Sequence, residues 1–412
     1  MAVWAKDTAA GTRRRDDATL VTAAAFAALM ASVAHGDERS AGDIAGDLLA
    51  RGAAPERVYR AAVRALLGRA VGPARGRAGL PHGLWALTAA YYLAEAVPAG
   101  RRAGLAARAV ALAAADWPAG EPVPDALPAA RPASLQAWSP SPSSEAPNGE
   151  LAGLVAMRAL AGDGTGAEWA LARLLAGGDG GSAPADTARH AAYTAVMRAA
   201  AVTELRGHRW GHTLVGAQHA IEMAELLSPA ETFLALRPAL WMVARSAGHG
   251  GATGATEPPP NDPRALMRLD AAVLTTARVL AAALGPPDGA KPRRRPVTLA
   301  DHAIHVLLAL HAARRAIELD VAGQWALAAV STLVARLTSE AQGLSPRLDT
   351  PAPARNSQGA VAAAAARLGT AHAIAVAEAA LAEHVALAAR APRTAAAVLG
   401  AVGAWLGGAR GR

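Results

Sequence analysis

Alanine supplies most of the apolar residues of this 412-residue chain, and this narrows the fold class more than any motif does. Alanine is the best helix former, whereas strong strand formers are sparse, with only two phenylalanines and four tyrosines. No segment combines β-branched residues with a sustained alternation of apolar and polar side chains. The sequence therefore predicts an all-α fold.

Stretches rich in proline, glycine and serine separate the helical patterns and suggest how the chain is divided. We expect an N-terminal tail over residues 1–16 and a first helical subdomain over residues 17–115. A Pro/Ser-rich linker over residues 116–148 then leads to a larger helical subdomain over residues 149–408. Both subdomains are expected to share one core. No apolar run of about 18 residues lacks charges, so no membrane-spanning segment is expected.

The absence of cysteine excludes disulfides, thiolate zinc sites and iron–sulfur clusters, and it suits the reducing cytoplasm, where we expect the protein to reside. The net charge of +8 comes almost entirely from arginines scattered along the helical patterns. Nucleic-acid grooves interleave basic residues with stacking aromatics, and this chain lacks that interleaving. We therefore expect no nucleic-acid partner.

Four helical segments align when each is started at a histidine. They read "HGLWALTAAYYLAEA", "HTLVGAQHAIEMAEL", "HVLLALHAARRAIEL" and "HAIAVAEAALAEHVA", and we call their leading residues the histidine quartet: His82, His212, His305 and His372. The position six residues on is always polar: Thr88, Gln218, His311 and Glu378. Three segments carry glutamate thirteen residues on: Glu95, Glu225 and Glu318. This pattern indicates an internal repeat of helical units.

Related helices packed around an axis would present their histidines at a similar height, as the helices of a bundle do when they build a metal site. The sequence therefore predicts a multi-helix bundle with histidine-bearing repeat helices around a central site. Neutral imidazole binds iron, zinc, copper and nickel alike. Paired Glu-x-x-His motifs of a di-iron site are absent, and catalytic zinc usually takes three protein ligands. A mononuclear Fe(II) that keeps positions open for dioxygen and substrate fits the pattern best.

Further side chains are candidates for roles around such a site. His302, His311 and His219 are candidate acid–base groups. Candidate pocket aromatics are Trp85, Trp210, Tyr92, Trp241 and Trp325, although large aromatics also serve as ordinary core residues. No GxGxxG fingerprint opens a strand–helix unit, so no flavin or nicotinamide cofactor is expected.

The segments "LPHGLWALTAAYYLAEA", "GHTLVGAQHAIEMAE", "IHVLLALHAARRAIE" and "AHAIAVAEAALAE" resemble the helices of questin oxidase-like proteins, a family that includes non-haem iron oxygenases cleaving anthraquinones in polyketide pathways. The segments "HGDERSAGDIAGDLLARGA" and "GLPHGLWALTAA" are also similar to helical domains that some bacteria fuse to a Rieske module. The resemblance covers roughly residues 20–390 and rests on pattern rather than on a rigid signature.

This resemblance implies an all-α fold and one iron held by the histidine quartet. The family's iron site also contains a carboxylated lysine, but neither Lys6 nor Lys291 lies on a histidine-led segment. Glu378 is the candidate for the missing carboxylate, and a site of histidines and water alone is the alternative. The implied reaction is the oxidative cleavage of a C–C bond in a quinone or polycyclic aromatic polyketide, with dioxygen as co-substrate.

The leading hypothesis is thus a non-haem iron dioxygenase whose electrons come from the substrate or from a separate reductase. One alternative is a metal-free helical enzyme in which a histidine acts as general base on a polyketide. Another is a non-catalytic helical scaffold whose interior histidines belong to the core.

Overall fold

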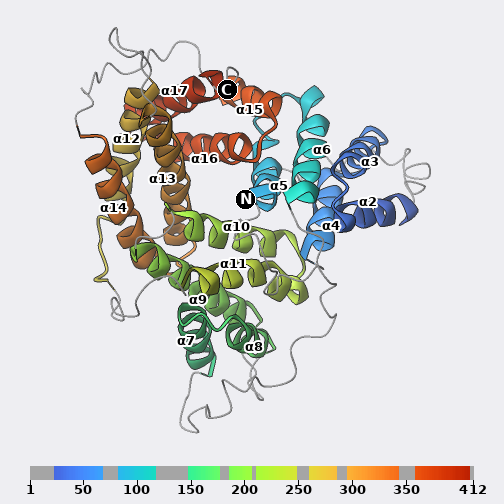
Figure 1. Ribbon diagram of the computed structural model, residues 1–412, viewed down its shortest axis with the longest axis horizontal. Helices are drawn as coiled ribbons and strands as arrows, with labels where there is room; N and C mark the ends of the chain where they lie inside the picture. Colours follow the sequence, from blue (N-terminus) through green and yellow to red (C-terminus); the bar gives the residue numbers. More distant parts are fainter. Residues whose placement is uncertain are drawn as a thin grey trace.

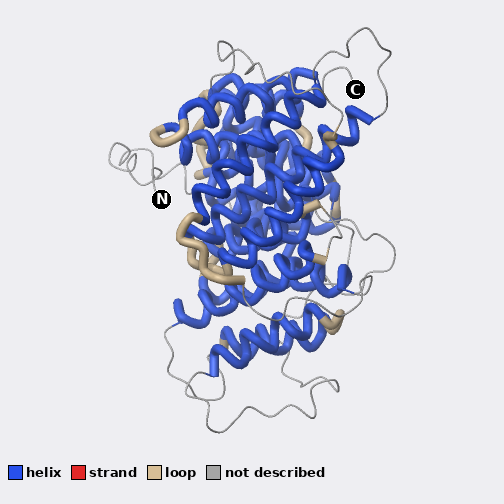
Figure 2. The backbone as a smooth tube through the Cα atoms, turned by 90° about the vertical axis from the view of Figure 1, so that its left-hand side faces the viewer, coloured by secondary structure: helices blue, strands red, loops and turns tan. Residues whose placement is uncertain are grey.

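The structure, a computed structural model, is all-α: its described residues form sixteen α-helices and one short 3-10 helix, with no strand among them (Figure 2). It describes residues 23–67, 82–116, 147–176, 185–206, 210–247, 259–284, 295–342 and 358–408. The expected tail (1–16) and nearly all of the expected linker (116–148) lie outside these ranges. The prediction of an all-α chain is confirmed.

The α-helices are α2 (Ala23–His35), α3 (Glu38–Ala50), α4 (Pro55–Leu67), α5 (His82–Leu93), α6 (Ala99–Asp116), α7 (Pro147–Leu160), α8 (Gly164–Leu175), α9 (Ala185–Leu205), α10 (His212–Leu226), α11 (Thr232–Ala247), α12 (Ala265–Leu284), α13 (Arg295–Glu318), α14 (Gly323–Glu340), α15 (Gln358–Leu368), α16 (Ala371–Ala388) and α17 (Pro392–Gly408). The 3-10 helix is η2 (Pro229–Glu231), between α10 and α11.

One hydrophobic core runs through the described helices, from Leu29 of α2 to Leu406 of α17. Alanine makes up much of it, and small side chains let helices approach one another closely. At the α3–α6 contact, for example, a Cβ on Gly42 would lie only 3.2 Å from that of Ala111. Buried residues of both expected subdomains belong to this one core.

Four helices that are far apart in the sequence surround the centre of the molecule. In Figure 1, α16 lies above α10, with α13 on the left and α5 on the right. Each packs against the next, in the closed order α5, α10, α13, α16 and back to α5. These are the helices that carry the histidine quartet.

Helix α16 is the one described helix that is long and apolar enough, by length and composition, to cross a membrane. Its 18 residues have a mean hydropathy of 1.3, and 61% of them are buried inside the protein. Its apolar character matches its place at the centre of the fold, where it packs against α5, α13, α15 and α17.

Candidate functional site

The four imidazoles of the histidine quartet come together in a closed arrangement that follows the order of their helices. The ring centres of His82 and His212 lie 5.9 Å apart, and those of His212 and His305 lie 4.4 Å apart. The centres of His305 and His372 are 5.2 Å apart, and His372 returns to His82 at 4.5 Å. Four segments spread over nearly 300 residues therefore meet at one point.

These spacings match those of imidazoles that share one ion. Two nitrogens that each lie about 2.1 Å from a metal are roughly 3.0 to 3.4 Å apart for angles between right and tetrahedral. The Nε2 atoms of His305 and His372 are 3.2 Å apart. The ring centres of neighbouring ligands would lie roughly 4.5 to 5.3 Å apart, close to most of the observed values.

The orientation and charge of the imidazoles also suit metal binding. The Nδ1 of His305 is 2.8 Å from the carbonyl oxygen of Asp301, to which it donates, and this turns an unprotonated Nε2 towards His372. Burial lowers the pKa of His305 to about 3, with help from the nearby His212 and His372. Burial, together with His212, lowers the pKa of His82 to about 4. Neutral imidazole is the form that binds metals.

The side chains as they stand do not form a finished coordination sphere. Within the described part of the chain, no group of three or more His, Asp or Glu residues is placed so that it could hold a metal ion. One observation nevertheless points to a missing partner, because the Nε2 of His82 is buried and has no hydrogen-bond partner. The donor type and this orphaned nitrogen suit a first-row transition metal, but the four imidazoles would have to shift from these positions to bind one ion.

The backbone before α10 is shaped to present His212. Trp210 has a φ of 53° and Gly211 a φ of 89°, so the chain enters the helix through two left-handed residues. This conformation is strained for a bulky side chain such as tryptophan. The buried carboxylate of Glu204 compensates, because it accepts hydrogen bonds from the backbone N–H of Gly211 at 2.9 Å and of Thr213 at 2.8 Å.

A glycine also sets the position of His82. A Cβ on Gly83, the next residue, would lie 2.3 Å from the carbonyl oxygen of Leu112 in α6, so only glycine lets the start of α5 lie against α6. At the start of α16, the hydroxyl of Thr370 caps the helix by accepting from the N–H of Ala373 at 3.2 Å. Local backbone features therefore hold the quartet in place.

Of the predicted pocket aromatics, Trp85 contacts the quartet, and Trp210 contacts the neighbouring His302. The buried ring of Trp85 lies 4.9 Å from that of His82 and 5.8 Å from that of His212, measured between ring centres. Trp210 stacks on His302 with 4.0 Å between ring centres, and the Nδ1 of His302 lies 2.8 Å from a Glu340 oxygen. His302 thus flanks the quartet one helical turn before His305.

The other two predicted tryptophans lie elsewhere. The indole N–H of Trp241 donates to Glu168 at 2.6 Å, across the contact of α11 with α8. Trp325 is buried on α14 beneath the guanidinium of Arg198, which lies 5.2 Å from the ring centre. Neither tryptophan lines the cavity described below.

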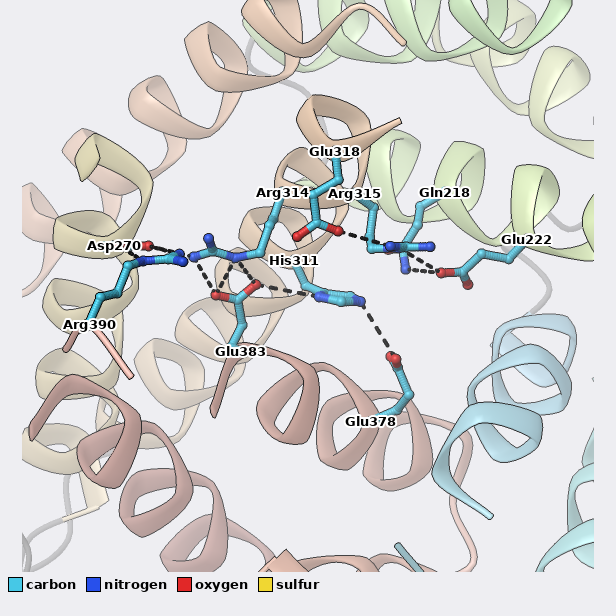
Figure 3. Close-up of polar contacts among 10 residues, drawn as sticks. All are labelled: Gln218, Glu222, Asp270, His311, Arg314, Arg315, Glu318, Glu378, Glu383 and Arg390. Atoms are coloured by element: carbon cyan, nitrogen blue, oxygen red, sulfur yellow. Dashed lines mark hydrogen bonds and ion pairs between the residues drawn. The ribbon is translucent and has the colours of Figure 1, made fainter. Parts of the chain in front are cut away.

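Glu378 does not join the histidine quartet, although it was the candidate carboxylate ligand. It lies six residues beyond His372 on α16, where its Oε1 is 3.6 Å from the Nε2 of His311. The Nδ1 of His311 is 3.4 Å from Glu383 on its other side (Figure 3). Burial opposes protonation of His311, but the charges of Glu378, Glu383 and Glu222 outweigh it and raise the pKa of His311 to about 9.

The charged cluster of Figure 3 extends from this histidine in two directions. Towards α12 and α17, Arg314 donates to both oxygens of Glu383 at 2.8 and 2.9 Å and to Asp270 at 2.8 Å. Arg390 also donates to Asp270, at 2.7 and 3.1 Å. Arg314 and Glu383 are almost completely buried, so each is the other's essential counterion.

Towards α10, the cluster continues through Glu222. This buried carboxylate accepts a hydrogen bond from the Nε2 of Gln218 at 2.9 Å, and its other oxygen lies 3.2 Å from the Nδ1 of His219. Burial alone would raise the pKa of Glu222, but the hydrogen bond with His219 and the charge of His311 lower it. His219 in turn lies beside Trp85, with 6.0 Å between ring centres. The predicted acid–base groups His219 and His311 therefore share one cluster.

A cavity of about 600 Å³ opens beside this cluster. Tyr92, His311, Arg315 and Glu378 are among the residues that line it, whereas no member of the quartet is. Of the glutamates thirteen residues after the quartet, Glu95 and Glu318 line this cavity. Glu225 instead accepts hydrogen bonds from Arg189 at 2.9 Å and Tyr193 at 2.8 Å.

Sequence reasoning missed four acidic residues of this region: Glu204, Glu222, Asp270 and Glu383. Glu222 carried a recognisable signal, because it follows His219 by three residues and so shares its helical face. The hydrogen-bond partners of Glu204, Asp270 and Glu383 come from other turns and helices, so no spacing in the sequence predicts these contacts.

Comparisons with known proteins do not assign a family or a function to this chain. No family model, no curated protein and no solved structure matches the chain.

Proposed function

We propose that this chain is a non-haem iron oxygenase that holds a single Fe(II) with the histidine quartet. The observation that carries the proposal is the closure of four imidazoles from four helices, with the Nε2 atoms of His305 and His372 3.2 Å apart. In this proposal each of four related helices contributes one histidine ligand, and the four histidines lie at one height around a central site. Neutral nitrogen donors without thiolates suit iron.

Bound iron would supply the redox chemistry between dioxygen and an electron-rich organic substrate. The chain's own residues hold the ligands in place. Trp85 packs beside the quartet on the core side, and the Trp210–His302 stack flanks it. We propose a quinone or polycyclic aromatic polyketide as substrate, with cleavage of a C–C bond, in the cytoplasm. Electrons come from the substrate or from a separate reductase.

Metal content tests the proposal directly. The chain is stripped with a chelator, reconstituted anaerobically with Fe(II), desalted and analysed for metals, and we expect about one iron per chain. The His212→Ala and His305→Ala variants are expected to retain none. His190→Ala is the matched control, because His190 is exposed on α9 and outside the quartet, and this variant should bind iron as the parent does.

Uptake of dioxygen with a polycyclic hydroquinone, measured on the same preparations, then tests the reaction class. The oxygenase proposal fails if no iron binds after reconstitution. It also fails if the iron-loaded protein binds such substrates without consuming dioxygen.

A second function, metal-free catalysis with a histidine as general base, is favoured by one specific observation. His311 lies between Glu378 and Glu383 and lines the cavity, so carboxylates orient its imidazole. Because their charges raise its pKa to about 9, it would act as a general base only at high pH. Activity on a polyketide that survives removal of all metal and is lost in His311→Gln would identify this function instead.

A further inference from the structure

The cavity beside the charged cluster has a charged floor and a largely apolar wall. Glu222, His311 and Glu378 form the floor and are between 3 and 8% exposed. The wall includes Leu93 and Leu381, and the exposed Val385 and Tyr92 lie at the mouth. At about 600 Å³, the cavity has the size of sites that bind small organic molecules.

The arginines around this cavity already have carboxylate partners. Arg314 is held by Glu383 and Asp270, on the side away from Glu222. Arg315 donates to Glu318 at 2.9 Å and is 3.8 Å from Glu222. Four carboxylates line the cavity, at positions 95, 222, 318 and 378, against two arginines and His311. The floor itself holds two carboxyl groups, Glu222 and Glu378, and one imidazole, His311.

Within the described part of the chain, the carboxyl group of Glu378 has an ion pair with His311 but no hydrogen bond. Its nearest partner, His311, is 3.6 Å away, beyond hydrogen-bond distance, and both ring nitrogens of His311 are buried without a hydrogen-bond partner. Buried polar atoms are almost always hydrogen-bonded to protein, water or ligand. In Figure 3 the carboxylates of Glu222 and Glu378 lie on the side of His311 that faces away from Glu383.

We propose that this cavity is a binding site for a protonated amine with an apolar body, whose ammonium group donates hydrogen bonds to Glu378 and Glu222. An ammonium group supplies donors only, as an ionised Glu378 requires. Burial raises the pKa of Glu378, and a cation bound beside it would stabilise its ionised form. The apolar body lies along Leu93, Leu381 and Val385. The site is separate from the histidine quartet, and the proposal stands independently of the proposed iron chemistry.

Three indole compounds that share one aromatic body and differ in the charge of the chain end test this site. Tryptamine is positive, tryptophol neutral and indole-3-propionate negative, and binding to the full-length protein is measured by titration calorimetry. We expect tryptamine to bind and the other two to bind at least tenfold more weakly. Glu222→Gln and Glu378→Gln are expected to weaken tryptamine binding roughly ten- to a hundredfold, as losing a hydrogen bond to a charged group does. Glu225→Gln is the matched control, because Glu225 lies on the same helix as Glu222 but outside the cavity.

Tryptophol or indole-3-propionate binding as tightly as tryptamine overturns the proposal, and so does tryptamine binding that is unchanged in Glu378→Gln. Circular dichroism of each variant verifies that the helices are intact. Iron content is measured in parallel, and we expect it to be equal in the parent and in both cavity variants. Loss of amine binding with normal iron content, or the reverse, therefore distinguishes failure of one proposal from failure of the other.

Discussion

His305 and His372 stand 67 residues apart in the chain, yet their Nε2 atoms face each other across 3.2 Å. The carbonyl of Asp301 accepts a hydrogen bond from the opposite nitrogen of His305, so the nitrogen that faces His372 is a lone-pair donor. His82 and His212 close the arrangement from two further helices. If these four imidazoles bind a metal ion as proposed, the metal will raise the free energy of unfolding.

Metal is expected to stabilise the folded protein, because the quartet exists only in the native state. At a concentration about a hundredfold above its dissociation constant, Fe(II) adds about 2.7 kcal/mol to the free energy of unfolding, which raises Tm by about 3 °C for a chain of this size. Anaerobic differential scanning calorimetry measures the shift, and a chelator reverses it. His372→Ala should show no shift, and an equal shift in that variant would contradict metal binding by the quartet.

Gly83→Ala is expected to destabilise the protein by about 1 to 3 kcal/mol, because the added Cβ would lie 2.3 Å from the carbonyl oxygen of Leu112. Moving α5 away from α6 also displaces His82, so affinity for metal falls. Gly104→Ala in α6 is the matched control: a Cβ there meets nothing within 4 Å, and the change should stabilise by up to about 1 kcal/mol. Urea denaturation of both variants checks this, and equal effects would refute the close approach of α5 and α6.

Stability is expected to fall as the pH rises from 6.5 to above 9, because of His311. Glu378 and Glu383 face this residue from α16 and Glu222 from α10, and they raise its pKa to about 9, above the value of an unfolded histidine. A histidine with a raised pKa stabilises the fold fully below its unfolded pKa, and this contribution disappears as the pH passes the folded value. The contribution of His311 to the free energy of unfolding is on the order of 3 kcal/mol. Chemical denaturation at pH 6.5, 8 and 9.5 measures the slope. His311→Gln should flatten it, and an unchanged slope would show that other groups control it.

Glu383→Gln is expected to destabilise the protein by about 3 to 5 kcal/mol, because it leaves the buried guanidinium of Arg314 without its principal counterion. Arg51→Ala removes the exposed pair with Asp47, in which both side chains are more than half exposed, and should cost less than about 1 kcal/mol. Thermal and urea unfolding compare the two variants. A small effect of Glu383→Gln would mean that water reaches Arg314.

Much of the fold could be anticipated because helix formation is encoded over a few residues. Alanine-rich helical patterns between Pro/Gly-rich breaks predicted an all-α chain, and the described residues are helical with no strand. The common register of His82, His212, His305 and His372 singled out four segments, and their imidazoles do come together.

Other site features depend on packing between distant segments, which the local pattern does not encode. Glu378 follows His372 by six residues, which places it about 9 Å further along the axis of α16. At that distance it lies beside His311 rather than beside the quartet. Arg314 meets Glu383 and Asp270 only because α12, α13 and α16 pack together. Helical periodicity thus predicts which residues share a face of one helix, whereas the partners of that face follow from three-dimensional packing of the whole chain.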